Sequence, residues 1–188
     1  MTDILATFYA RLLPLFQPRT SSYLNRLTPE DLYSTNFRYI FSVQNMITIS
    51  HIIEDAVIRS PGVAETHVSF QYFSRFRFQQ RRYRRVAEAS RGVWIYGFQD
   101  IPIPSLPRTV AVPTDGTPLV KYWFVIAYGP GIYMTLLAEE IFSDGQERAY
   151  EGFYTFQAAT AFQVISILHQ MFPNRVLAPT PPELHHMD

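Results

Sequence analysis

The sequence contains no cysteine among its 188 residues and only one lysine, Lys121. The missing thiols exclude disulfides, a thiolate nucleophile and the cysteine-based structural zinc sites. No apolar run approaches the roughly 20 residues that a membrane-spanning helix needs. The N-terminal stretch is apolar, but it carries Asp3 and Arg11 and lacks the basic start of a secretory signal. We therefore expect a cytoplasmic protein without membrane association.

Net charge is also absent, because 16 basic and 16 acidic residues cancel. A dedicated nucleic-acid binder usually has a basic excess, so this balance disfavours such a function. All basic residues except Lys121 are arginines, whose planar guanidinium binds carboxylate or phosphate through paired hydrogen bonds. The hydrophobic share of 47% and the aromatic share of 15% are typical of a globular domain with a sizeable core.

Motifs of catalysis and metal binding are missing as well. The sequence has no GxSxG, no P-loop and no GxGxxG. His51 and Asp55 have the spacing of two helical metal ligands, but no third ligand follows at a fitting distance, so we predict no metal site. Glu139 and Glu140 would point to opposite faces of a strand and cannot form an acid–base pair. We predict that the protein is not an enzyme, and the sequence identifies no cofactor.

The hydrophobic pattern predicts a single α/β domain with a mixed sheet of about five strands and flanking helices. Helices are expected at 3–13, from Thr28, 42–60 with Ser42 as its cap, 78–90 and 156–172. Strands are expected at 67–73, 93–98, twice within 123–142 and at 150–156. The unit 67–98 is then a βαβ unit with a parallel strand pair, and Gly129-Pro130-Gly131 closes an antiparallel hairpin.

The remaining segments are predicted to be connections or extensions. Residues 1–40 are interpreted as an N-terminal helical extension, 41–172 as the main domain and 173–188 as a disordered tail. The proline-rich connection after residue 99 fits a strand only around TVAV, residues 109–112. SDGQER, residues 143–148, is predicted to be a turn.

The segment FSRFRFQQRRYRR, residues 73–85, places six arginines among aromatic residues. Helical spacing puts one set of side chains on one face, namely Arg81, Arg84, Arg85 and Glu88, and a second set on another, namely Phe78, Arg82, Val86 and Ala89. We favour a solvated helix face whose apolar side packs on the sheet. A site for a phosphate or carboxylate ligand is the second interpretation, and contact with nucleic acid is the third.

Four stretches in this order resemble the DICT sensory domain: residues 68–98, 117–131, LLAEE at 136–140 and YEGFYTF at 150–156. The resemblance covers about residues 42–172. The positions that match the recurring pattern of the family are Phe76, Gln79, Tyr83, Arg84, Gly97, Trp123, Glu139, Glu151 and Gly152. It implies an α/β signalling module that binds a ligand or a partner and has no catalytic set. Familiar members are fused to an output domain, whereas here the resembling stretch is flanked only by about 40 residues before it and a short tail after it. We therefore expect a stand-alone module that acts through another protein.

From the resemblance and the arginine segment together we expect a ligand- or partner-binding site at eight residues: Arg77, Gln79, Arg81, Tyr83, Arg84, Trp123, Glu139 and Glu151. The expected partner is a regulated signalling protein, and the expected ligand is a small anion. Aromatic residues such as Trp123 are first of all core residues, with a ligand pocket as the second explanation. The alternatives are an assembly factor without a ligand and a nucleic-acid binder that uses Arg75–Arg85. We also expect a homodimer, because symmetric association would cover aromatic surface.

Overall fold

The structure is a computed structural model that describes residues 3–16, 37–102, 105–141 and 148–186. Its centre is a seven-stranded mixed sheet in the order β1-β7-β6-β5-β2-β3-β4. The strands are β1 (Phe37–Ser42), β2 (Glu65–Tyr72), β3 (Val93–Phe98), β4 (Thr109–Pro113), β5 (Tyr122–Gly129), β6 (Ile132–Ile141) and β7 (Ala149–Thr155). The predicted helix from Thr28 and most of the predicted turn at 143–148 lie outside the described residues.

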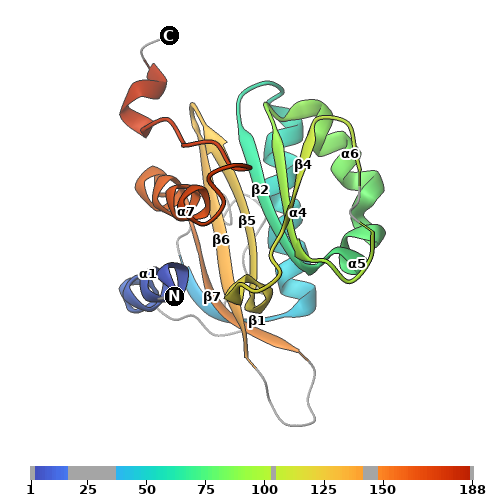
Figure 1. The fold of residues 1–188 in the computed structure, drawn as a ribbon. Coiled ribbons are helices and arrows are strands. Elements are labelled where there is room, and N and C mark those ends of the chain that lie inside the picture. The colour runs from blue at the N-terminus through green and yellow to red at the C-terminus, as the bar shows by residue number, and fades with distance from the viewer. Residues whose placement is uncertain (1–2, 17–36, 103–104, 142–147, 187–188) are drawn as a thin grey trace.

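Helices cover both faces of this sheet, as Figure 1 shows. The longer helices are α1 (Ile4–Leu12), α4 (Val43–Arg59), α6 (Gln80–Ala89) and α7 (Ala158–Met171). The short ones are η1 (Leu13–Leu15), α5 (Phe73–Phe76), η2 (Arg77–Gln79), η3 (Pro118–Lys121) and η4 (Pro182–His186). One apolar cluster joins α4, α5 and α6 to the sheet, and another joins α1 and α7 to its opposite face. None of the described helices is both long and apolar enough to cross a lipid bilayer.

The predicted fold class is confirmed, but the predicted strand number was too low. β2 and β3 pair in parallel through the α5–α6 connection, and β5 and β6 form the antiparallel hairpin. Beyond the predicted five are β1, which was not predicted, and β4, which contains the TVAV stretch that fitted a strand. The two lie at the edges of the sheet. Edge strands bury less of their surface and can contain proline, as β4 does at Pro113, so their sequence pattern is weak.

Local signals placed the start of α4 correctly. The Ser42 hydroxyl accepts a hydrogen bond from the Asn45 backbone N–H at 3.2 Å, as an N-cap does. Ser42 also ends β1, so the predicted division at residue 40 falls within a strand. β1 pairs with β7, which makes residues 37–42 part of the sheet rather than of a separate extension.

The C-terminal segment was predicted to be disordered, but the structure describes it as packed on the end of the sheet. The Tyr128 hydroxyl donates a hydrogen bond to the Thr180 carbonyl. The His185 ring is stacked on Tyr133, and its Nδ1 is 2.9 Å from the Tyr133 hydroxyl. The segment is held by these side chains, and no hydrophobic periodicity in the tail indicates them.

Gly152 is required by the close approach of β6 to β7. It pairs with Ala138, and a Cβ at residue 152 would lie 2.4 Å from both the Ala138 Cβ and the Leu137 carbonyl oxygen. Backbone atoms at that distance cannot give way without moving a strand.

Gly152→Ala should therefore lower the free energy of unfolding by about 1–3 kcal/mol, the usual cost of overpacking. Denaturant unfolding followed by circular dichroism would measure it. Gln163→Ala, an exposed position in α7, is the control and should stay within about 0.5 kcal/mol of the wild type. Equal stability of Gly152→Ala and the wild type would contradict the close approach of β6 to β7 at this position.

Candidate ligand cavity

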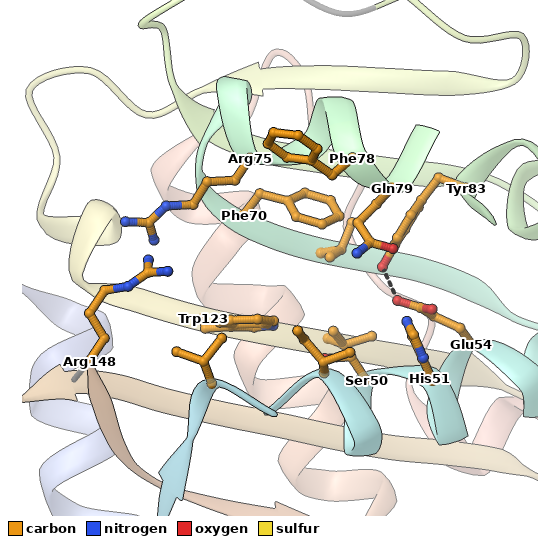
Figure 2. A pocket seen from close by; sticks show the side chains of 14 residues that line it. Ser50, His51, Glu54, Phe70, Arg75, Phe78, Gln79, Tyr83, Trp123 and Arg148 are labelled. Atoms are coloured by element: carbon orange, nitrogen blue, oxygen red, sulfur yellow. Dashed lines mark hydrogen bonds between the residues drawn. The ribbon is translucent and has the colours of Figure 1, made fainter. Parts of the chain in front are cut away.

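A cavity of about 280 Å³ lies between α4, the sheet and the segment that contains α5 and α6. Its lining residues are mostly apolar, and they are Val43, Ile47, Ser50, His51, Glu54, Val68, Phe70, Arg75, Phe78, Gln79, Tyr83, Trp123, Val125 and Arg148. Small-molecule sites typically measure about 300–1,000 Å³, so this cavity is slightly smaller than the lower limit of that range. Figure 2 shows Arg75 and Arg148 at one end of it and His51 and Glu54 at the other.

Strand alternation explains why the sheet contributes these side chains. Trp123 and Val125 lie on the α4 face of β5, while Phe124 between them packs on the α7 face. Trp123 and the Tyr150 ring are in edge-to-face contact at a centroid distance of 5.4 Å, and this contact restrains the indole. The apolar floor of the cavity therefore follows from the period of two along β5.

The His51–Glu54 end is closed by a buried carboxylate. Glu54 is 3% exposed, and one of its oxygens accepts a hydrogen bond from the Tyr83 hydroxyl at 2.7 Å. The Arg82 Nε donates to the other oxygen, and Arg82 Nη2 donates to Asp55 at 2.7 Å and to the His51 carbonyl at 2.9 Å. This cluster joins α4 to α6 across the end of the cavity.

Burial sets the protonation of these groups. It raises the pKa of the Glu54 carboxyl, against the opposing effect of the hydrogen bond from Tyr83 and the charge of Arg82. Burial also raises the pKa of Tyr83, which keeps its hydroxyl neutral and able to donate. The pKa of His51 is lowered by burial and then by the neighbouring Arg82, so the imidazole that faces the cavity is neutral near pH 7.

At the opposite end of the cavity, the lining residue Arg75 is bonded to Gln71, a buried residue with a positive φ of 65°. Its side-chain amide donates to the Val120 carbonyl at 2.9 Å and to Glu140 at 2.7 Å. Its oxygen accepts from Arg75 and from the Tyr150 hydroxyl. All donors and acceptors of the amide are therefore used. A left-handed backbone in a residue other than glycine carries strain and is often found near functional sites.

Three of the eight predicted site residues line the cavity, namely Gln79, Tyr83 and Trp123. Arg77, Arg81 and Arg84 are exposed and do not contribute to it. Glu139 and Glu151 are partners in the β6–β7 register and lie near Tyr9, on the opposite face of the sheet. The predicted set is thus divided among the cavity, the outer surface of α6 and the α1 side of the sheet.

The two predicted faces of the arginine segment are only partly correct. Arg81, Arg84 and Arg85 are exposed as expected. Phe78, which was placed with the packed side, lies in η2 ahead of α6 and is 88% exposed. The residues that sequence reasoning missed are Ser50, Glu54, Gln71 and Arg148. One feature of the sequence could have indicated Glu54. Arg82 shares a helical face with apolar residues, and a cation on such a face requires an acidic partner.

His51 and Asp55 have the spacing of two metal ligands in the sequence, without a third. Within the described ranges no group of three histidine and acidic side chains is placed to hold an ion. Asp55, the suggested companion of His51, instead accepts a hydrogen bond from Arg82.

The architecture is thus that of an α/β domain with an internal cavity, and the comparison with protein families specifies it further. The family model described as the sensory domain in diguanylate cyclases and two-component systems, DICT, matches residues 22–141. This match covers more than half of the chain, so the protein belongs to the DICT family. No curated protein matches the chain. The matched residues include all of α4, β2, α5, α6 and β5.

The ion pair at the closed end gives a direct test of the cluster. Arg82→Met should lower the free energy of unfolding by about 3 kcal/mol, because it leaves the Glu54 carboxyl buried without its cation. Arg81→Met removes the same charge from the adjacent, exposed position and should change stability by less than about 0.5 kcal/mol. Urea unfolding of the two variants would measure the difference, and equal effects would show that the Glu54 cluster does not hold α4 to α6.

Proposed function

We propose that the protein is a non-catalytic sensory module that binds a small molecule in the cavity between α4 and the sheet and regulates a partner protein accordingly. Membership of a sensory family supports the signalling role. A cytoplasmic location, expected from the sequence, is part of the same proposal. The observation that carries the ligand site is the environment of Ser50.

The Ser50 hydroxyl lines the cavity, is buried, and has no hydrogen-bond partner within the described part of the chain. A buried hydroxyl left without a partner costs about 1–3 kcal/mol. An apolar residue at position 50 would avoid this cost and would suit a helix that packs on a sheet. A ligand that hydrogen-bonds to Ser50 would supply the missing partner and account for a polar residue at this position.

The wall that contains α6 supports the regulatory part of the proposal. Tyr83 faces the cavity, while Arg81 and Arg84 in the same turn of α6 are exposed. A change in α6 on ligand binding would therefore move cationic side chains on the outer surface. We propose that this surface, together with the exposed ring of Phe78, contacts an acidic region of the partner.

A substitution that fills the cavity tests the ligand site. Ser50→Leu should raise the free energy of unfolding by about 1 kcal/mol, because it removes the unpaired hydroxyl and fills empty space. The same variant should lose any bound small molecule. Native mass spectrometry of the wild type and the variant, each purified from the source organism, would compare the two masses with that of the bare chain.

Thr48→Leu is the matched control, since Thr48 is an exposed residue of α4 two positions away. It should keep the bound molecule that the wild type carries. A wild-type protein that carries no molecule, or a Ser50→Leu variant that carries as much as the wild type, would contradict the proposed site. A stoichiometric partner protein found without a small molecule would favour an assembly role instead.

A further inference from the structure

The two ends of the cavity differ in whether their arginine side chains are paired with acidic residues. At the closed end, the Arg82 guanidinium is occupied by Glu54, Asp55 and the His51 carbonyl. At the other end, Arg75 is bonded to a neutral group, the side-chain oxygen of Gln71. Arg148 forms no ion pair with another described residue. The cation at the closed end is therefore paired with carboxylates, whereas the two at the other end form no ion pair among the described residues.

Gln71 lies between Arg75 and a half-buried acidic side chain, that of Glu140. Its amide accepts from Arg75 and donates to Glu140 at 2.7 Å, so the Glu140 charge is one residue removed from the guanidinium. Asp100 is also near Arg75, but it is exposed and accepts the Ser74 backbone N–H at 3.0 Å. Since a guanidinium has five N–H donors, Arg75 retains donors for a further acceptor.

The two arginines are arranged around one position. Figure 2 shows the guanidinium groups of Arg75 and Arg148 turned toward each other beside Trp123. Arg75 also lies over the Tyr72 ring at 4.8 Å from its centroid, which restrains the side chain without neutralising it. Both cations line the edge of the same apolar cavity, and an anion between them would offset their mutual repulsion.

The body of the cavity is apolar and flanked by aromatic rings. Trp123 lies on one side and Phe70 on the other, with Val68 and Val125 on the sheet between α4 and α6. Such walls favour a flat hydrocarbon or aromatic group. Ser50 and the neutral His51 can hydrogen-bond to a polar atom at its far end.

From this asymmetry we infer that the cavity binds an amphipathic organic acid, whose anionic group lies between Arg75 and Arg148 and whose flat apolar body covers Trp123. The inference rests on the proposed function, because it specifies the ligand of the same cavity. A carboxylate, a sulfonate and a phosphate monoester share the chemistry that the paired guanidinium groups recognise.

Two dyes that differ by one charged group test the inference. 8-Anilinonaphthalene-1-sulfonate and N-phenyl-1-naphthylamine have the same ring system, and only the first carries an anion. Both gain fluorescence in an apolar site. The wild type should bind the sulfonate about tenfold more tightly than the neutral dye, as one charged hydrogen-bonded contact provides. Ser50→Leu should weaken both dyes, which locates them in the cavity.

Matched double variants assign the charge preference to the cavity arginines. Arg75→Gln with Arg148→Gln should remove the tenfold preference and leave the affinity for the neutral dye unchanged. Arg77→Gln with Arg84→Gln removes the same net charge from the outer surface and should retain the preference. If the first double variant loses both dyes, the single variant Arg148→Gln decides, because residue 148 is exposed and its replacement does not disturb the core.

The outcomes separate the two proposals. If the wild type binds both dyes equally, or if Arg148→Gln keeps the full preference, the organic-acid inference is wrong while the cavity remains a ligand site. If neither dye binds to the wild type, the proposed ligand cavity itself fails. If the preference is lost equally in both double variants, the effect is one of net charge, and the inference is again contradicted.

Discussion

The cavity depends on the contact between the buried Glu54 carboxylate of α4 and two side chains of α6. Glu54 is buried on α4 and accepts hydrogen bonds from Tyr83 and Arg82, both on α6. These contacts set the separation of the two helices at one end of the cavity, where apolar packing alone would favour closer contact. Because a buried charge is costly without its partners, the helices cannot separate without exposing or neutralising it. A rigid end and an apolar floor together keep the space open.

The contact with Glu54 fixes the position of α6, and therefore of the residues on both its cavity side and its exposed side. Tyr83 contributes to the cavity, and Arg81 and Arg84 are exposed on the other side of α6. At the opposite end of the cavity, Arg75 is hydrogen-bonded to the side-chain oxygen of Gln71 and, among the described residues, to no carboxylate. A ligand that engages Arg75 would thus act on the end of the cavity that is also lined by the exposed Phe78.

Sequence reasoning predicted the features that local patterns determine. The Ser42 cap, the hairpin at Pro130-Gly131 and the parallel pair around α6 depend on neighbouring residues and were correct. The edge strand β1 was not predicted, and β4 was recognised only as the stretch TVAV, because its surroundings are rich in proline. Ser50 was not identified, because a serine in an amphipathic helix looks like a boundary residue. Arg148 could not be assigned, since its approach to Arg75 results from strand order and not from spacing in the chain.

The measurement that tests this account most directly is a crystal structure of the protein grown with 8-anilinonaphthalene-1-sulfonate. We expect the naphthalene ring on Trp123, the sulfonate between Arg75 and Arg148, and the Glu54–Arg82 contact intact at the other end. A cavity filled by its own side chains, with the dye bound only on the outer surface, would contradict the account.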